Sequence, residues 1–575
     1  MKDIVVKLVA KAVGMPVSEV KNLLEVPPKP ELGDYAFPCF GLAKTLRKNP
    51  MAIAEDLVKK LRKKLPKEIS NVDFNGAYVN FFVDKKILAE GVLKKVGKNV
   101  RGAKKNGKKI MIEFSQANTH KAFHVGHIRG TSLGESLARI AEFMGDEVVR
   151  ANYQGDTGMH VAKWIWCYNK YHKKEGLKKD ESWIAGVYVD AVKRLAADSS
   201  KDDPAGPDKL QAEVDEINRK LDSREDAELN KLWKETRKLS LDALEVVYGD
   251  LNTGFDKYYF EGDVEQAGKK IVAELVKKKI AKVDDDATIV DLKDEGMGVW
   301  VLLRRDGTVL YSAKDIALAQ QKFEDYDLAR SIYVVADAQN LHINQLVKIL
   351  ELMKFKDVRK VSHRNYGLVR LPTGKMSSRT GDNILYSDFK KEIVDFAKKG
   401  IAERSDVKGK ALSGHDSGEP DLDARALAIA VAAIKYSMLK QDTGKTIVFD
   451  KAKALRFEGD TGPYLLYSYA RASSIVRKVK SKKAVEIVDL KDQEVKLLKK
   501  IATFGDVVKR AYENLSPNLI ANYSFELAQM FNEFYHLCPV LGSIEEGFRL
   551  KLVDAFRVTL KKSLDLLGID VLEEM

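Results

Sequence analysis

The sequence contains few cysteines. Among its 575 residues there are three, Cys39, Cys167 and Cys538, which lie far apart and are not paired with nearby histidines. This spacing excludes a zinc site of the C-x-x-C type and indicates a reducing compartment. We expect each cysteine to serve as a small buried hydrophobic side chain.

A long hydrophobic segment and a secretory signal are also missing. The longest apolar run, Ala426 to Ile434, has nine residues and ends at Lys435, so it is too short to cross a bilayer. The first residues, Met1 to Ile4, lead into an amphipathic pattern with recurrent lysines. No internal repeats are visible. We therefore expect a cytoplasmic protein with no membrane association.

Positive charge is in excess. The 98 lysines and arginines outnumber the 84 aspartates and glutamates, which gives a formal net charge of +14, and hydrophobic residues make up 45% of the chain. The length suits three or four domains of about 150 residues. Composition alone leaves two explanations of the charge open, solubility and a polyanionic partner.

The stretch from Met111 to Gly134 has the pattern of a phosphate-binding turn. It follows an apolar run, Lys109 to Phe114, that predicts a buried strand, and it leads into Thr131 to Ile140, whose apolar residues recur at helical spacing. A polar turn between a strand and a helix holds anions, because the free N–H groups and the dipole of the first helical turn favour negative charge.

Four residues of this turn carry the chemistry. His124 and His127 are three apart, so both can face the same side of a helix start. Together with Lys121 they can donate hydrogen bonds to a phosphate as its charge develops. Gly126 removes a side chain where a ligand must approach the backbone. Taken alone, the pattern could also be two ordinary surface histidines and a solvated lysine.

A second motif, Lys375 to Arg379, reads Lys-Met-Ser-Ser-Arg and follows a Thr-Gly pair that gives it freedom to move. The two motifs resemble the HIGH and KMSKS signatures of class I aminoacyl-tRNA synthetases, and the frame S-Q-A-N-x-x-K-x-x-H-V-G-H-I-R resembles that of arginyl-tRNA synthetases. Arg379 replaces the second lysine of the consensus. The resemblance implies an ATP site made by Lys121, His124, Gly126, His127, Lys375, Met376, Ser377 and Ser378, in which His124, His127, Lys375 and Lys121 are catalytic.

The resemblance also implies an arginine site. A guanidinium is a planar fork of donors, and fixed carboxylates and amide oxygens match it. The residues that correspond to the family's arginine-binding positions are Asn118, Glu261, Tyr311, Asp315 and Gln339. Asp315 alone could equally be a helix N-cap. We expect a strand from Thr308 to Ala313 and a helix that begins at Asp315. Thr157 stands where the family has an aromatic residue.

The predicted fold class is α/β, with three segments. Residues 1–107 form a small N-terminal α/β domain, residues 108–415 a Rossmann-type nucleotide-binding catalytic domain with an insertion at about 160–285, and residues 424–575 an all-α anticodon-binding bundle. Aromatic and amide groups that can stack on or read unpaired bases, and so contact tRNA, are Tyr78, Asn80 and Tyr464.

The activity that the resemblance implies is arginine–tRNA ligation. L-Arginine reacts with ATP, assisted by Mg²⁺, and the arginyl group passes to the terminal adenosine of tRNA(Arg); family members are generally monomers and generally need tRNA for activation. Two alternatives stay open. One is a synthetase for another amino acid, such as cysteine or glutamate. The other is a non-catalytic tRNA-binding paralogue, although such a chain should have lost His124, His127 or Lys375, and all three are present.

Overall fold

The computed structural model describes residues 1–575 except 200–208, 306, 373–384, 408–421, 480–484 and 488. The chain divides into two compact units, each built from segments that are distant in sequence. Unit 1 consists of Met1–Val100, Ile475–Phe504 and Gln529–Thr559, and unit 2 of Arg101–Ser474, Gly505–Ala528 and Leu560–Met575.

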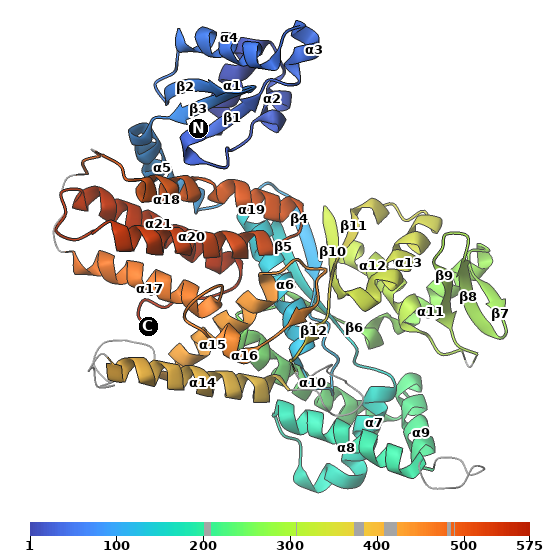
Figure 1. Ribbon diagram of the computed structural model, residues 1–575. Helices are drawn as coiled ribbons and strands as arrows, with labels where there is room; N and C mark the ends of the chain where they lie inside the picture. Colours follow the sequence, from blue (N-terminus) through green and yellow to red (C-terminus); the bar gives the residue numbers. More distant parts are fainter. Residues whose placement is uncertain (200–208, 306, 373–384, 408–421, 480–484, 488) are drawn as a thin grey trace. The chain divides into compact units, whose positions relative to one another are not determined.

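Unit 1 contains a three-stranded antiparallel sheet in the order β1-β3-β2, flanked by helices (Figure 1). A buried ion pair joins two of its C-terminal helices, because Nε of Arg549 in α21 lies 2.7 Å from Oε1 of Glu494 in α18. The elements are α1 (Lys2–Val13), α2 (Val17–Leu23), η1 (Pro30–Leu32), β1 (Tyr35–Pro38), α3 (Leu42–Leu46), α4 (Pro50–Arg62), β2 (Ile69–Asn75), β3 (Tyr78–Val83), α5 (Lys85–Asn99), α18 (Asp492–Ala502), and parts of α20 (Asn518–Leu537) and α21 (Glu546–Leu566).

Unit 2 is built on a five-stranded parallel sheet in the order β11-β10-β4-β5-β6. Numbered along the chain, these strands run 3-2-1-4-5 across the sheet, which is the doubly wound order of a Rossmann-type fold. The order reverses between β4 and β10, and ligands bind at the carboxyl ends of the strands at such a point. The strands are β4 (Lys109–Glu113), β5 (Glu147–Gln154), β6 (Lys257–Phe260), β10 (Arg330–Ala336) and β11 (Val361–Tyr366).

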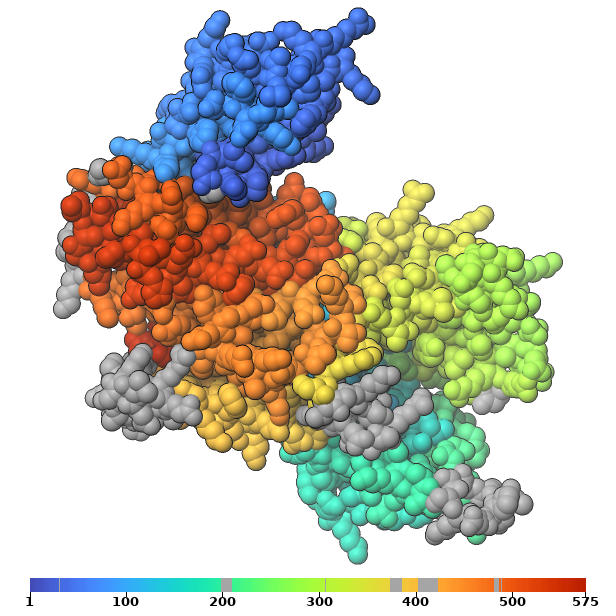
Figure 2. All heavy atoms as spheres, in the orientation of Figure 1, coloured from blue at the N-terminus to red at the C-terminus, as the bar shows by residue number. Residues whose placement is uncertain are grey.

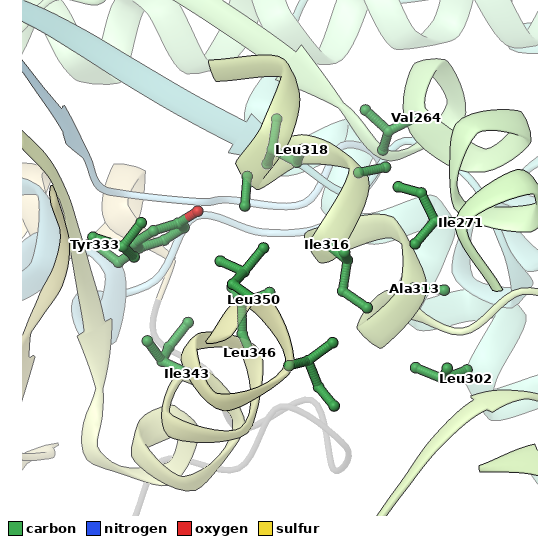
Figure 3. Packing of buried hydrophobic residues seen from close by; sticks show 14 of the residues in the cluster. Val264, Ile271, Leu302, Ala313, Ile316, Leu318, Tyr333, Ile343, Leu346 and Leu350 are labelled. Atoms are coloured by element: carbon green, nitrogen blue, oxygen red, sulfur yellow. The ribbon is translucent and has the colours of Figure 1, made fainter. Parts of the chain in front are cut away.

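Three helices cover one face of this sheet. They are α11 (Glu261–Lys277), α12 (Tyr311–Asp325) and α13 (Asn340–Leu352), and they bury Val264, Ile316 and Leu346 in one cluster with strand residues such as Tyr333 (Figure 3). Burial of an aliphatic side chain of this kind stabilises a fold by about 1.5–3 kcal/mol. The cluster fixes the carboxyl ends of the strands relative to the first turns of these helices.

Helix α6 (Val125–Phe143) covers the other face, with Leu137 and Ile140 beside Ile112 of β4. It approaches the strand closely, because a Cβ added at Gly134 would overlap the side chain of Phe114. Glycine is therefore required at this position, and its small size lets α6 start directly above the end of β4.

Two further parts of unit 2 surround the sheet. Helices α7 (Met159–Cys167), α8 (Glu181–Ser199), α9 (Lys209–Ser223) and α10 (Ala227–Asp250), with η2 (Tyr168–His172) and η3 (Lys173–Glu175), lie between β5 and β6 and share a core of their own. Strands β7 (Lys282–Asp284), β8 (Ala287–Leu292) and β9 (Gly298–Leu303) form an antiparallel sheet at the edge of the unit, the light green lobe of Figure 2. The remaining elements are η4 (Asp337–Gln339), η5 (Val358–Lys360), β12 (Val369–Arg370), α14 (Tyr386–Val407), α15 (Leu422–Leu439), β13 (Ile447–Val448), α16 (Lys451–Ala454), α17 (Gly462–Lys478) and α19 (Phe504–Glu513).

The strand predicted at Thr308 to Ala313 was wrong. Only Val309 bridges to Leu303, and α12 begins at Tyr311 rather than at Asp315. Alternation over six residues did not distinguish a strand from a helix start. Because Asp315 lies inside the helix, the alternative reading of this residue as an N-cap is excluded.

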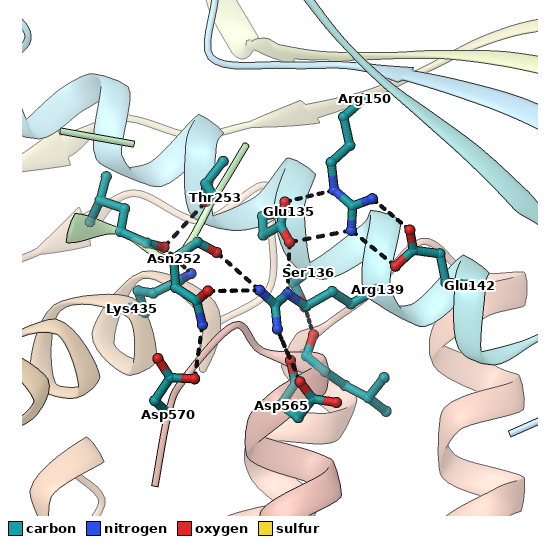
Figure 4. A network of polar contacts seen from close by, with 12 residues as sticks. Glu135, Ser136, Arg139, Glu142, Arg150, Asn252, Thr253, Lys435, Asp565 and Asp570 are labelled. Carbon is teal, nitrogen blue, oxygen red and sulfur yellow. Dashed lines mark hydrogen bonds and ion pairs between the residues drawn. The ribbon is translucent and has the colours of Figure 1, made fainter. Parts of the chain in front are cut away.

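The second half of α6 is held by an ionic network (Figure 4). Buried Glu135 accepts hydrogen bonds from Arg139 at 2.7 Å and Arg150 at 2.9 Å. Arg139 also donates to the carboxylate of Asp565 at 3.0 Å, and the hydroxyl of Ser136 donates to the carbonyl of Leu566 at 2.7 Å. Residues from the end of α21 thus pack on the helix that begins at the predicted ATP site.

Candidate active site

The turn after β4 has a backbone that ordinary side chains rarely adopt. The φ angles of Ser115, Gln116 and His120 are 76°, 48° and 61°. The buried His120 ring lies between two threonine hydroxyls, with Nε2 2.8 Å from Thr236 of α10, and its backbone N–H donates to Ser240 at 3.0 Å. Contacts to α10 therefore hold the strained turn in place.

The two histidines of the turn cap helix α6. Nδ1 of His124 accepts from the backbone N–H of Gly126 at 3.1 Å, and Nδ1 of His127 accepts from the N–H of His124 at 3.2 Å. Their rings stack with centroids 3.9 Å apart. Because each Nδ1 accepts a hydrogen bond, the proton of each neutral ring is on Nε2, where it can be donated to a ligand.

Both histidines are neutral at physiological pH. Burial lowers the pKa of His124 to about 4 and lowers the pKa of His127 well below its ordinary value. The rings can therefore donate hydrogen bonds without carrying charge. The positive charge beside them is Lys121, whose pKa burial lowers while the nearby Glu261 opposes the shift.

Asn118 and Glu261 approach each other across a glycine. A Cβ at Gly155, the first residue after β5, would overlap Oδ1 of Asn118 and lie 3.2 Å from Oε1 of Glu261. Glu261 is the first residue of α11, directly after β6. The carboxyl ends of three neighbouring strands thus bring these side chains together.

The carboxylate of Glu261 has a partner that the sequence did not indicate. Nζ of buried Lys314, the residue before Asp315, lies 3.4 Å from Oε2 of Glu261 and 3.3 Å from the hydroxyl of Thr157. Burial raises the pKa of Glu261, and the lysine opposes this effect. Its position next to Asp315 was the available signal. Thr157 is buried here and contacts this lysine, where the family has an aromatic residue.

Asp315 is oriented by a histidine. Its Oδ2 lies 2.6 Å from Nε2 of His342 in α13, while Nδ1 of that ring accepts from the indole N–H of Trp300 at 3.2 Å. The ring of Tyr311, which is 58% exposed, lies 4.8 Å from the ring of His342. Asp315 is an electrostatic neighbour of Glu261, so both carboxylates act on the same region.

The other predicted site residues are not brought into this cluster. Gln339 is exposed at the end of η4, and its side chain has no contact recorded among the described residues. Lys375, Met376, Ser377 and Ser378 lie outside the described residues. The predicted tRNA contacts are elsewhere: Tyr78 begins β3 with its ring 5.6 Å from that of Phe40, Asn80 is buried in the same strand, and Tyr464 in α17 contacts Phe525.

Sequence reasoning also missed Arg129, which lies one turn into α6. Its buried guanidinium donates to the carbonyls of Gly367 at 2.5 Å, Lys445 at 2.7 Å and Thr443 at 2.9 Å, with longer bonds to Leu368 and Asp442. These carbonyls precede β12 and β13. One side chain therefore joins α6 to the segment that leads into the second motif.

One cluster of potential metal ligands occurs among the described residues, and it corrects the expectation that no cysteine lies near a histidine. Oδ2 of Asp190 lies 3.4 Å from Sγ of Cys167 and 3.1 Å from Nε2 of His172. The same oxygen accepts from Nε of Arg194 at 2.7 Å, so a cation already neutralises it. We assign this cluster a role in joining the end of α7 to α8.

A doubly wound parallel sheet with an H-x-G-H turn at the start of its first helix defines the catalytic domain of a class I aminoacyl-tRNA synthetase. Residues 88–451 match the family described as tRNA synthetases class I (R), catalytic domain. Residues 1–83 match the arginyl tRNA synthetase N terminal domain and residues 465–575 the DALR anticodon binding domain. The chain belongs to the arginyl-tRNA synthetase family.

Similar proteins span the whole chain. The arginine–tRNA ligase of Clostridium acetobutylicum is 34% identical and that of Clostridium botulinum 35%, each over 100% of both chains. The solved arginyl-tRNA synthetase of Thermus thermophilus is 27% identical, covers 99% of this chain and has a TM-score of 0.78. That of Plasmodium falciparum, at 20% identity over 100% of this chain and a TM-score of 0.75, shows the same fold. No helix in the described part of the chain is long and apolar enough to cross a membrane.

Proposed function

We propose that the chain activates L-arginine with ATP and transfers it to tRNA(Arg). In the first step the carboxylate of arginine attacks the α-phosphorus of ATP, the bond to the β-phosphate oxygen breaks, and arginyl-adenylate and pyrophosphate form. In the second step the 2′-hydroxyl of the terminal adenosine attacks the arginyl carbonyl, and AMP leaves. The supporting observation is that Asp315 and Glu261 act on one region beside the neutral His124–His127 pair, in a chain whose full length matches arginine–tRNA ligases.

His124 and His127 are assigned to the phosphates of ATP. Their Nε2–H donors are fixed by the helix-capping bonds, so they need no rearrangement as negative charge develops in the transition state. Lys121 supplies positive charge beside them, and Gly126 keeps the backbone accessible. The proposed ATP site is completed by Lys375, Met376, Ser377 and Ser378, where Lys375 neutralises the leaving pyrophosphate.

The carboxylates are assigned to arginine. Asp315 faces the guanidinium with Tyr311, and Glu261, Asn118 and Gln339 hold the remaining polar groups of the substrate. The clamp of His342 on Asp315 favours this role, because a carboxylate with a fixed orientation loses less freedom when it binds a planar guanidinium.

Mg²⁺ is proposed to enter with ATP. Mg²⁺ prefers oxygen ligands and is usually held by substrate phosphates and water. The described groups at the phosphate site are imidazole and ammonium donors, which do not suit it. We therefore assign no side chain to the ion, and its role is to neutralise phosphate charge.

The domain limits given above, 1–107, 108–415 and 424–575, are proposed as functional segments. The first and last bind tRNA(Arg), with Tyr78, Asn80 and Tyr464 as contacts. The proposed protein is a cytoplasmic monomer, which agrees with its three free, buried cysteines.

Aminoacylation with labelled arginine and each set of tRNAs tests the proposal. Arginine should be the amino acid that drives ATP–pyrophosphate exchange, and the exchange should depend on tRNA(Arg). Exchange driven by cysteine or glutamate would instead assign the chain to another amino acid. Binding of tRNA without aminoacylation would make it a non-catalytic paralogue.

A further inference from the structure

Tyr153 has a polar atom with nothing to bind. The residue is the last but one of β5, and its hydroxyl oxygen is buried with no hydrogen-bond partner among the described residues. Buried hydroxyl groups are nearly always satisfied, because an unpaired one loses its bonds to water without replacement. An orphaned hydroxyl near a ligand site is therefore an indication of a missing ligand group.

The position of the side chain places it at the arginine site. The ring packs on the core beneath α11 and α12, whereas the amide of the preceding Asn152 donates to Tyr248, on the other face. Two residues further on, Gly155 separates Asn118 from Glu261. The hydroxyl thus lies on the face of the sheet that carries Asp315 and Glu261, close to the ends of the strands.

Its electrical surroundings support the same placement. Burial raises the pKa of Tyr153 well above its ordinary value, and the charged groups that add most to this shift are Asp315 and Glu261. The phenol is therefore neutral, and it lies near two carboxylates without being bonded to either. A cationic ligand between these acids would supply the N–H donor that the phenol oxygen lacks.

The neighbouring strand offers a contrast. Tyr259 of β6 is paired with Tyr153 across the sheet, and its hydroxyl donates to the carboxylate of Asp325 at 3.0 Å. Both tyrosines contribute to the same hydrophobic cluster. One hydroxyl is thus used by the fold and the other is not.

We propose that the hydroxyl of Tyr153 is a further substrate-binding group, which accepts a hydrogen bond from the guanidinium of arginine. This inference rests on the proposed function. Loss of a hydrogen bond to a charged group weakens binding by about ten- to hundred-fold.

The test compares Tyr153→Phe with Tyr259→Phe in the full-length chain. Tyr153→Phe should raise the KM for arginine about ten- to hundred-fold, with an unchanged KM for ATP and an unchanged or higher unfolding temperature, because no internal bond is lost. Tyr259→Phe should lower the unfolding temperature and leave the KM for arginine unchanged. Lower stability of Tyr153→Phe with an unaltered KM would overturn the inference.

A substrate analogue locates the contact. In 5-guanidinovalerate the guanidinium is kept and the α-amino group is absent, so its inhibition constant should rise by the same factor as KM in Tyr153→Phe. An unchanged inhibition constant would place the contact at the α-amino group and refute the assignment to the guanidinium. Asp315→Ala separates the two levels: if it raises the KM for arginine while Tyr153→Phe does not, only the inference about Tyr153 fails.

Discussion

Nε2 of His342 lies 2.6 Å from Oδ2 of Asp315, and the opposite ring nitrogen accepts from Trp300 at 3.2 Å. Since an indole N–H only donates, the ring must donate from Nε2 to the carboxylate. His342 thus fixes a side chain that is proposed to hold the substrate, although it need not touch the substrate.

Replacement of His342 by alanine should therefore weaken arginine binding. We expect the KM for arginine to rise by about ten-fold or more, because the bond to a charged group is lost and the carboxylate becomes free to turn. The KM for ATP should change little. Steady-state exchange kinetics measure both constants.

A matched control is His363→Ala, which removes a histidine bonded to Asn340 of the same helix, from a strand interior. This variant should retain the KM for arginine. Equal effects of the two substitutions would mean that α13 is disturbed as a whole and would remove the specific role of His342.

Gly155→Ala should separate the two substrates. The new methyl group would overlap Oδ1 of Asn118 and press on Glu261, so the KM for arginine should rise by at least about ten-fold while ATP binding is retained. Gly249→Ala is the control, because a Cβ there meets nothing within 4 Å and alanine favours the helix. Equal arginine kinetics in both variants would show that Asn118 and Glu261 do not meet the substrate.

The stability of unit 2 should fall in mild acid. Burial lowers the pKa of His120 to about 3, so from pH 6.5 downward the unfolded chain binds a proton that the folded chain does not. Stability is complete above the unfolded pKa and decreases as the pH falls, by about 2 kcal/mol at pH 5 from this group alone.

Urea unfolding between pH 5 and pH 7.5 measures this slope. His120→Gln should reduce it, since the replacement does not titrate, whereas His536→Gln, at an exposed position of α20, should leave it unchanged. A slope unaltered by His120→Gln would contradict the buried neutral state of this ring.

Arg129→Gln should destabilise unit 2 strongly. The shorter side chain leaves several buried carbonyls without a donor, and each orphan costs about 1–3 kcal/mol. Thermal unfolding should begin several degrees lower than in the wild type. Arg219→Gln, at an exposed pair with Glu216, should have no measurable effect. Equal unfolding curves would mean that water replaces the guanidinium.

Local pattern was enough to predict the strand, turn and helix around His124 and the carboxyl end of β5, because these features depend on neighbouring residues. Family resemblance added Glu261 and Asp315, which lie 54 residues apart in the sequence and are brought to one region by the sheet order. Neither source indicated that Trp300 orients His342 or that Arg129 binds five carbonyls. Such contacts depend on side-chain directions set by tertiary packing. The start of α12 was mispredicted because six residues do not define a period.

The contact of residues 560–575 with α6 has a consequence for biosynthesis. Ser136 binds the carbonyl of Leu566, and Asn252 donates to Asp570, so the catalytic unit includes residues that leave the ribosome long after its sheet. A nascent chain that still lacks them would expose Glu135 and Arg139 without their late partners. Maturation of the ATP-binding helix is thereby delayed until translation has passed the anticodon-binding segment, and premature termination in α21 would give an inactive product.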